Sequence, residues 1–432
     1  MRDSAGMTRV AIVGTGYVGL TTGACFAHLG HEVVCGDVDE KKISGLSVGE
    51  IPFLEDQLGH LVNEGINNNR LRFVLGAEAA VAGCEVAFLC VPTPQNPDGS
   101  ADVSYIETAT REIAEALPNG AILVNKSTVP VGTTRVVEEV LERDGVAVVS
   151  NPEFLREGSA VQDFLKPDRI VIGAKDRVAA GVVAALYKDI AAPVLVTDPV
   201  SAETIKYAAN AFLATKLSFV NAITAVCEGV EADVDDVMAG LGYDSRIGSD
   251  YLRPGPGWGG SCLPKDTRAL VRLAEDAGYD FRLLKSVIEV NEEQFTRVVA
   301  KVRDAAGDEL DGRALAVWGL TFKAGTDDLR DSPALAIVGL LLAEGAEIRA
   351  YDPTVGTDGP YPVGLVDVLG DPLSTCEGAD ALVVLTDWDE FRGIEPFVVA
   401  ERMANRAVVD ARNVLDRQAW QQAGFDYRGI GC

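Results

Sequence analysis

The sequence predicts an α/β protein with two doubly wound parallel sheets, joined by a central helical region that contains one long helix. Three observations support this prediction. Short apolar strands alternate with helical patterns at the start of the chain, a proline-free stretch of helical spacing begins at Ser201, and a second alternation begins at Arg313. The expected boundaries are 7–198 for the first sheet, 199–303 for the helical region and 311–432 for the second sheet.

The strands expected in the first sheet are apolar runs rich in β-branched residues and bounded by turns. They are "VAIVG" (10–14), "EVVCGD" (32–37), "EVAFLCV" (85–91), "AILVNKS" (121–127), "VAVVS" (146–150), "RIVIG" (169–173) and "PVLVT" (193–197). Unusual loops follow these strands at 90–94, 125–134 and 150–158. Because ligands of such sheets bind beyond the carboxyl ends of the strands, we expect these loops to line one crevice.

The stretch 201–230 has no proline, and its apolar residues recur at intervals of three and four residues, which predicts a long helix. Its apolar positions surround nearly the whole helix, which favours burial on several sides, including contact with a partner subunit. Helical patterns continue to about residue 303, before the second alternation at 313–320, 347–353, 380–388 and 407–416. This second alternation lacks a dinucleotide glycine fingerprint.

Composition and charge narrow the classes of function. The 432 residues are 47% hydrophobic and 24% charged, and the longest apolar runs, such as 335–343, are too short for a membrane span. The net charge of −27 disfavours nucleic acid and anionic membranes as partners. We therefore expect a globular protein of the cytoplasm whose anionic ligands need a local cluster of basic residues.

Cysteine and histidine usage narrows the chemistry. The eight cysteines form no C-x-x-C pair, as is usual in a reducing cytosol. The three histidines, at 28, 31 and 60, lie far from every candidate nucleophile in sequence, which disfavours a Cys-His site and a histidine-rich metal site. We expect no metal, and acid–base groups are expected to be Lys, Asp or Glu.

A dinucleotide-binding turn is expected at "GTGYVG", where Gly14, Gly16 and Gly19 lie between the first strand and a helix. Asp37 ends the second strand about 20 residues further on, where a carboxylate accepts the ribose hydroxyls and repels a 2'-phosphate. This pattern favours NAD over NADP.

Two pairs of polar residues lie in or after the crevice loops. Lys206 and Asn210 share one face of the long helix, where they can stabilise an oxyanion or orient water, although a solvated helix surface has the same pattern. Glu153 and Glu157 have the same spacing, which fits a water or ribose site and an exposed turn equally well. Thr128 is open to a similar choice between capping a turn and binding a ligand.

The stretch "RPGPGWGGSCLPKD" (253–266) presents Cys262 among turn residues. Pro264 suits the first turn of a helix, so Cys262 is expected at a helix N-terminus, where the helix dipole and Lys265 favour the thiolate and Asp266 can handle a proton. The alternative is a small buried residue in a rigid loop. Arg246 and Arg253, just upstream, indicate an anionic substrate with phosphate groups.

Together these motifs resemble the UDP-glucose/GDP-mannose dehydrogenase family, and the resemblance spans nearly the whole chain. It rests on "VAIVGTGYVGL", "CVPTPQNPDGSAD", "NKSTVPVGT", "NPEFLREGSA", "PDRIVIG", "KYAANAFLATK", "DSRIG", "PGWGGSCLPKD", "GLTFKAGTDDLRDSP" and "DARNVLD". It implies a Rossmann-like NAD-binding domain, a central dimerisation region and a Rossmann-like C-terminal domain that binds the UDP-sugar. A homodimer or higher homo-oligomer through the central helix is therefore expected. Trp258 departs from the family, which more often has Phe or Tyr at this position.

The resemblance also implies roles for individual residues. The catalytic residues are Cys262, Lys206, Asn210, Asp266, Glu153 and Thr128. The cofactor-binding residues are Gly14, Gly16, Gly19, Asp37, Lys42, Thr93, Thr128, Glu157 and Arg330. The substrate-binding residues are Glu153, Lys206, Asn210, Arg246 from a neighbouring subunit, Tyr251, Arg253, Gly259, Lys323 and Arg412.

The implied activity is the NAD-dependent, four-electron oxidation of UDP-glucose to UDP-glucuronate through a thiohemiacetal and a thioester on Cys262. GDP-mannose or another nucleotide sugar is the alternative substrate. A two-electron hydroxyacid dehydrogenase also fits Lys206 and Asn210, but it gives the Cys262 motif no role. A non-catalytic NAD-sensing or scaffold protein is the alternative from another class.

Overall fold

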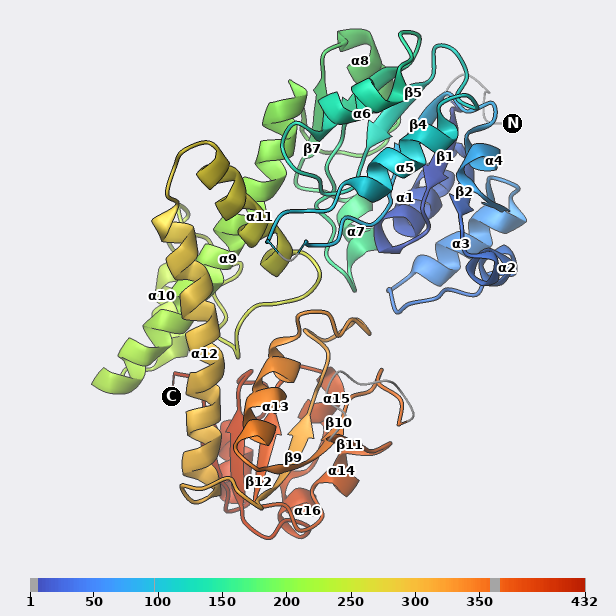
Figure 1. The fold of residues 1–432 in the computed structure, drawn as a ribbon. Coiled ribbons are helices and arrows are strands. Elements are labelled where there is room, and N and C mark those ends of the chain that lie inside the picture. Colours follow the sequence, from blue (N-terminus) through green and yellow to red (C-terminus); the bar gives the residue numbers. More distant parts are fainter. Residues whose placement is uncertain (1–6, 97, 358–365, 432) are drawn as a thin grey trace. The chain divides into compact units, whose positions relative to one another are not determined.

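The computed structural model describes residues 7–96, 98–357 and 366–431. The chain divides into two units by its internal contacts. Unit 1 comprises residues 1–209 and 268–273, and unit 2 comprises residues 210–267 and 274–432. The ribbon in Figure 1 carries the element labels used below.

The described residues of unit 1 form an eight-stranded sheet in the order β3-β2-β1-β4-β5-β6-β7-β8. The strands are β1 (Arg9–Val13), β2 (Glu32–Asp37), β3 (Leu71–Leu75), β4 (Val86–Leu89), β5 (Ile122–Asn125), β6 (Ala147–Ser150), β7 (Ile170–Ala174) and β8 (Val194–Thr197). Neighbouring strands are parallel except β6 and β7, which are antiparallel. The segment between these two strands contains only the short helix α7 (Ala160–Leu165), and the chain enters β7 at the same end of the sheet at which it left β6.

Helices cover both faces of this sheet, because its strands are apolar on both faces. In β1, Val10 and Ile12 face one buried cluster, whereas Ala11 and Val13 face the other. The first cluster includes residues of α1 (Tyr17–His28), α2 (Glu40–Ser47), α3 (Leu58–Asn67), α7 and α8 (Arg177–Ala185). The second includes residues of α4 (Ala77–Val81), α5 (Ser104–Ile113) and α6 (Thr133–Leu141).

The helical region contains the long helix α9 (Pro199–Val230), as predicted, followed by α10 (Val234–Gly242), α11 (Leu263–Asp276) and α12 (Arg282–Ala306). Helix α9 passes a test of length and hydropathy for a membrane span, but 44% of its most apolar window is buried inside the protein. The core helix of a soluble protein passes the same test. Val220 and Cys227 of α9 pack against Val234 and Met238 of α10.

The second sheet, in unit 2, is parallel in all its described pairs and has the order β11-β10-β9-β12-β13-β14. Its strands are β9 (Ala314–Trp318), β10 (Glu347–Tyr351), β11 (Val366–Val368), β12 (Ala381–Val384), β13 (Ala407–Asp410) and β14 (Asp426–Gly429). Its helices are α13 (Pro333–Ala343), α14 (Pro372–Thr375), α15 (Asp389–Arg392), α16 (Pro396–Ala400) and α17 (Arg417–Gln422).

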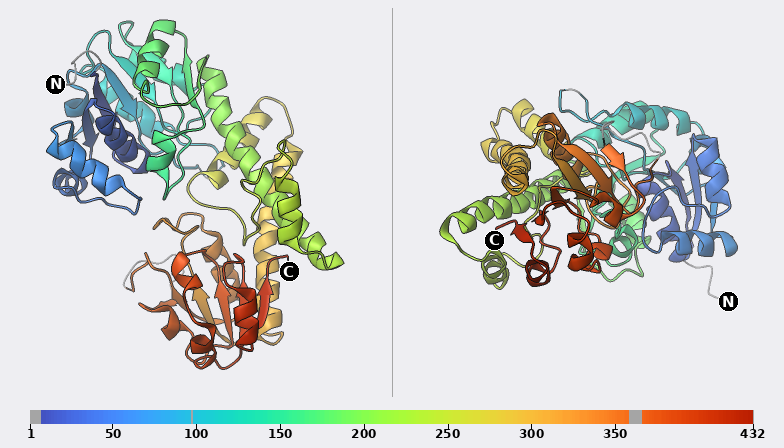
Figure 2. Two further views of the ribbon diagram at one scale, coloured as in Figure 1. Left: turned by 180° about the vertical axis from the view of Figure 1, so that it is seen from behind. Right: turned by 90° about the horizontal axis from the view of Figure 1, so that it is seen from below.

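This sheet also has a buried cluster on each face. Helices α12 and α13 contribute to one cluster, and α15, α16 and α17 contribute to the other. Figure 2 shows the sheet, in orange and red, between these helices. The predicted architecture of two Rossmann-like sheets with a long helix in the central region is confirmed.

Candidate active site

The glycine-rich turn between β1 and α1 combines two tightly packed positions with one open position. Gly14 has a φ of 95°, and a Cβ atom there would lie 2.7 Å from the carbonyl oxygen of Cys90. A Cβ atom on Gly19 would lie 1.9 Å from the carbonyl oxygen of Gly14. By contrast, no protein atom lies within 4 Å of the Cβ position of Gly16, the N-cap of α1. The helix N-terminus therefore has room for the close approach of a pyrophosphate.

The carboxylate of Asp37 ends β2 and is held by the same turn. One of its oxygens accepts hydrogen bonds from the backbone N–H and the hydroxyl of Thr15, at 2.9 and 2.6 Å, and from Lys42 at 3.1 Å. The other accepts the N–H of Asp39 at 3.1 Å. Burial would raise the pKa of Asp37, but the hydrogen bonds from Thr15, Asp39 and Lys42 lower it below its usual value. The second oxygen can still accept a ribose hydroxyl, so these residues fit NAD.

A buried ion pair joins the loop after β6 to helix α9. The ammonium of Lys206 lies 2.8 Å from Oε1 of Glu153, and both side chains are less than 5% exposed. The same carboxylate accepts the hydroxyl of Thr128 at 3.3 Å and the N–H of Leu155 at 2.6 Å. Burial would raise the pKa of Glu153, but Lys206, the N–H of Leu155 and Lys126 together lower it. Two oppositely charged groups are therefore held in a fixed geometry beyond the carboxyl end of β6.

The remaining expected cofactor residues of unit 1 belong to the crevice loops. The hydroxyl of Thr93 donates to the carbonyl oxygen of Thr128 at 2.8 Å, which ties the loop after β4 to the loop after β5. Glu157 is half-buried in the segment before α7. Lys42, on α2, contacts Asp37 as described above.

Two further residues in unit 1 stabilise these loops and were not anticipated. Lys126 is buried, and its ammonium donates to Asn151 at 3.2 Å and to the hydroxyl of Tyr187 at 3.3 Å. Burial lowers the pKa of Lys126 to about 8. Glu203, on α9, accepts the backbone N–H groups of Gly132 and Thr134 at the start of α6, at 2.6 and 2.9 Å. Lys126 lies inside the quoted motif "NKSTVPVGT", whereas Glu203 has no sequence signal.

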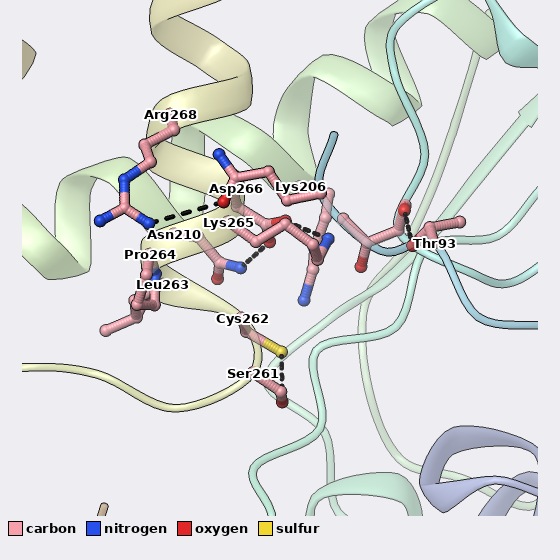
Figure 3. A network of polar contacts seen from close by, with 12 residues as sticks. Thr93, Lys206, Asn210, Ser261, Cys262, Leu263, Pro264, Lys265, Asp266 and Arg268 are labelled. Carbon is pink, nitrogen blue, oxygen red and sulfur yellow. Dashed lines mark hydrogen bonds and ion pairs between the residues drawn. The ribbon is translucent and has the colours of Figure 1, made fainter. Parts of the chain in front are cut away.

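In unit 2, Cys262 directly precedes the first residue of α11. Its carbonyl oxygen accepts the N–H of Asp266 at 2.9 Å, and its sulfur lies 3.6 Å from the hydroxyl oxygen of Ser261. Cys262 is partly exposed, whereas the other described cysteines are buried. The helix dipole therefore acts on a thiol that solvent can reach. Figure 3 shows the sulfur of Cys262 beyond the start of α11.

The carboxylate of Asp266 is fully buried and lies between an amide and an ammonium. Asn210 donates its side-chain N–H to Oδ2 at 2.6 Å, and Lys265 donates to Oδ1 at 2.6 Å (Figure 3). Lys265 was expected to favour the thiolate of Cys262, and in the structure it forms an ion pair with Asp266. The structure thus brings Asn210 and Asp266 into direct contact, although they lie in different helices.

Arg412 follows β13 and is the most constrained of the expected substrate-binding cations. Its guanidinium donates to the carbonyl oxygens of Leu385 and Phe322, both at 2.9 Å. It forms no ion pair with any described residue, so neither contact neutralises its charge. Such a guanidinium is suited to an anionic ligand.

The other expected residues of unit 2 vary in exposure. Arg246 and Arg330 are largely exposed and pair with Asp244 and Asp328, at 2.6 and 2.7 Å. Tyr251 has a φ of 60°, and a Cβ atom on Gly259 would lie 2.0 Å from the carbonyl oxygen of Asp331. Arg253 is exposed and Lys323 is partly buried. Arg330, which was expected to bind the cofactor, belongs to unit 2, whereas the glycine turn belongs to unit 1.

The second sheet has a counterpart of Asp37 at a strand end, but both oxygens of its carboxylate accept hydrogen bonds from protein groups. Asp352, which follows β10, accepts from Leu320, Thr321, Thr354 and the indole of Trp388 at 2.8 to 3.2 Å. Both of its oxygens are engaged, and the residue is only 2% exposed. Each oxygen of Asp352 accepts at least two donors, whereas one oxygen of Asp37 accepts a single donor, the N–H of Asp39.

Comparison with known proteins identifies three matching regions. Residues 8–191 match the NAD binding domain of the UDP-glucose/GDP-mannose dehydrogenase family, residues 200–293 its central domain and residues 316–417 its UDP binding domain.

Individual proteins match over nearly their whole length. The chain is 45% identical to a UDP-glucose 6-dehydrogenase of Rhizobium meliloti, with 98% of this chain and 99% of that protein covered. It is 43% identical to UDP-glucose 6-dehydrogenase TuaD of Bacillus subtilis, with 98% and 93% covered. A solved UDP-glucose dehydrogenase from Pyrobaculum islandicum superimposes with a TM-score of 0.92 at 36% identity and covers 100% of this chain and 99% of its own.

Proposed function

Because the chain belongs to the UDP-glucose/GDP-mannose dehydrogenase family, we propose that it oxidises C6 of UDP-glucose to the carboxylate of UDP-glucuronate with NAD. The chain is an NAD-dependent oxidoreductase that acts on a nucleotide sugar. The observation that carries the four-electron reaction is the partly exposed thiol of Cys262 at the start of α11. A dehydrogenase that stops at the aldehyde needs no such nucleophile.

The proposed sequence of steps follows from the residues. NAD, when bound, accepts the hydride of each oxidation, and a nearby base accepts the hydroxyl proton that each oxidation releases. After the first oxidation, the sulfur of Cys262 forms a bond to the aldehyde carbon, and the thiol proton passes to a nearby base. The thiohemiacetal is oxidised to a thioester. Water then cleaves the carbon–sulfur bond, which gives the carboxylate and restores the thiol.

Each polar residue has a role that suits its contacts. The ammonium of Lys206 and the amide of Asn210 stabilise the oxyanions that form at C6. Asp266 accepts a hydrogen bond from Asn210, and Glu153 accepts one from Thr128. These two carboxylates accept and donate protons and orient water during the addition and the hydrolysis. The guanidinium of Arg412, together with Lys323 and Arg253, binds the diphosphate of the substrate. Lys42, Thr93, Glu157 and Arg330 are assigned to the cofactor.

The test is to measure NADH released per sugar consumed over a panel of UDP-glucose, other UDP-sugars and GDP-mannose. We expect two NADH per UDP-glucose and faster turnover with UDP-glucose than with the other sugars. One NADH per substrate would indicate a two-electron dehydrogenase, and preference for GDP-mannose would reassign the substrate. Absence of turnover on every sugar would contradict the enzymatic function.

We also propose that the protein is a cytoplasmic homodimer or a larger homo-oligomer built through α9. Phe212, Phe219 and Val226 lie at seven-residue intervals on this helix and are 65%, 53% and 57% exposed. Residues at this spacing form one stripe along a helix, and a stripe of exposed apolar side chains is suited to pairing with a second copy.

Replacing Phe212 and Phe219 by glutamate is expected to convert the dimer into monomers, because the substitutions place charged groups where the proposed dimer interface would bury two phenyl rings. Sedimentation velocity at one protein concentration measures the change. The control is Phe397→Glu, which changes an equally exposed phenylalanine on α16 and should leave the assembly intact. A monomeric wild-type protein, or an assembly that survives the double substitution, would contradict the proposal.

A further inference from the structure

The loop that leads to Cys262 is buried without a β-ladder or a helix of its own. Residues 254–260 are buried except Gly257, which is half-buried. Backbone N–H and C=O groups that are removed from water need partners. In this loop the partners come from the side chains of two helices in unit 2.

Helix α12 supplies a side-chain amide that binds both backbone groups of one residue. Oδ1 of Asn291 accepts the N–H of Trp258 at 2.8 Å, and Nδ2 of Asn291 donates to the carbonyl oxygen of Trp258 at 2.9 Å. One turn further along α12, Gln294 donates to the carbonyl oxygen of Gly255 at 2.8 Å. Asn291 thus holds the backbone on both sides of one Cα atom.

Helix α9 holds the same two loop residues from another direction. Oδ1 of Asn221 accepts the N–H of Gly255 at 2.9 Å, and the hydroxyl of Ser218 accepts the indole N–H of Trp258 at 2.9 Å. The indole bond is one that Phe or Tyr cannot make at this position. The backbone of Trp258 itself, however, is bound by Asn291.

From Trp258 onward the chain has little freedom before it reaches Cys262. A Cβ atom on Gly259 would lie 2.0 Å from the carbonyl oxygen of Asp331, and one on Gly260 would lie 2.7 Å from the ring of Phe322. The N–H of Gly260 donates to the carbonyl oxygen of Asp331 at 3.3 Å. The close packing of Gly259 and Gly260 therefore leaves little room to absorb a displacement of Trp258 before the chain reaches Cys262.

We propose that Asn291 is a positioning residue for the thiol of Cys262. It does not contact the reacting atoms. It fixes the backbone at Trp258, and through the closely packed Gly259 and Gly260 it fixes the direction of the sulfur. This inference rests on the proposed function, since it assigns Asn291 to the addition of the thiol to the aldehyde.

A purely structural role is the competing explanation, because Asn291 also satisfies buried backbone groups. The two explanations differ in what they predict for the second oxidation. A structural loss lowers the amount of folded enzyme but leaves each folded molecule with two NADH per sugar. A misdirected thiol allows the aldehyde to escape, so the number of NADH per sugar decreases.

The experiment compares Asn291→Leu with Asn291→Ser in the full-length protein. Leucine removes both hydrogen bonds while keeping the branching and the number of side-chain heavy atoms, and serine leaves room for water to satisfy Trp258 if leucine prevents folding. The measurements are NADH per UDP-glucose, aldehyde trapped by a hydrazine, and the rate of Cys262 alkylation by iodoacetamide followed by mass spectrometry. We expect the fraction of sugar released as aldehyde to increase about ten-fold or more, because small misalignments of a nucleophile cost rate steeply.

Two control variants separate the outcomes. Val298→Ala removes a fully buried side chain from the same helix, away from the loop, and should lower stability while leaving two NADH per sugar. Trp258→Phe removes the indole bond to Ser218 and part of the buried ring but keeps the backbone bonds to Asn291, and it should also keep the stoichiometry near two.

Asn291 variants that fold, release no aldehyde and keep the wild-type alkylation rate would overturn the proposal. A wild-type protein that oxidises no nucleotide sugar would instead contradict the proposed function. In that case the alkylation rate alone decides whether Asn291 positions the thiol.

Discussion

Substitution of Cys262 by serine is expected to reduce NADH formation from two per UDP-glucose to one and to slow complete oxidation by about a thousand-fold or more. A hydroxyl at this position is a far weaker nucleophile than a thiolate at a helix N-terminus. The aldehyde would then leave or hydrate before a second oxidation. NADH absorbance with limiting sugar, together with mass spectrometry of the products, measures both effects.

The control for this substitution is Cys227→Ala, which removes a buried thiol of α9 that has no role in the proposed reaction. That variant should keep two NADH per sugar. If the serine variant also kept two NADH with normal turnover, Cys262 would have no place in the mechanism, and only the first oxidation would remain assigned.

Replacing Lys206 by methionine is expected to lower both activity and stability. The substitution leaves the buried carboxylate of Glu153 without the cation 2.8 Å away. Breaking a buried pair by removing one partner costs about 3–5 kcal/mol of unfolding free energy. Loss of the ammonium from the forming oxyanion is expected to slow turnover by about a hundred-fold or more.

The pH dependence of this loss follows from the lowered pKa of Glu153. In the wild-type protein that carboxyl contributes stability above its unfolded pKa of about 4.3, and the contribution is lost as the pH falls through the lower folded pKa. Lys206→Met removes the largest of the effects that lower this pKa, so the difference in stability between the two proteins is expected to be largest at neutral pH and to narrow below about pH 4. Urea unfolding at pH 7 and at about pH 3 measures this difference.

The double variant Lys206→Met/Glu153→Gln supplies the check. Removing both charges should recover most of the stability without recovering turnover. A single variant within about 1 kcal/mol of wild type at pH 7 would mean that this ion pair does not contribute as the geometry indicates.

The fold could be predicted largely because most of its strands are buried on both faces and form continuous apolar runs in the sequence. The strand β3 (Leu71–Leu75) was missed because it is an edge strand whose sequence, "LRFVL", contains an exposed arginine. The reversed direction of β7 was also missed. Strand direction depends on the path of the connection, and the short helix α7 gives no periodic signal of where the chain returns.

The candidate site was predictable where residues lie in turn-rich motifs at strand ends or helix starts, as with Gly14, Asp37 and Cys262. The supporting side chains were not. Asn291 meets Trp258 across 33 positions of sequence, and Glu203 meets Thr134 across 69. A single amide or carboxylate on a helix looks like a solvated surface residue until the tertiary structure shows which backbone it binds.

The saturated carboxylate of Asp352 has a consequence for the order of events in catalysis. Of these two carboxylates at strand ends, Asp37 has an oxygen with only one donor and Asp352 has none, so Asp37 is the better acceptor for a ribose hydroxyl. If each polypeptide has one such cofactor-binding site, the proposed reaction requires NADH to be exchanged for NAD between the two oxidations of each catalytic cycle. In the proposed reaction, the half-oxidised sugar therefore has to stay bound to the sulfur of Cys262 for as long as that exchange takes.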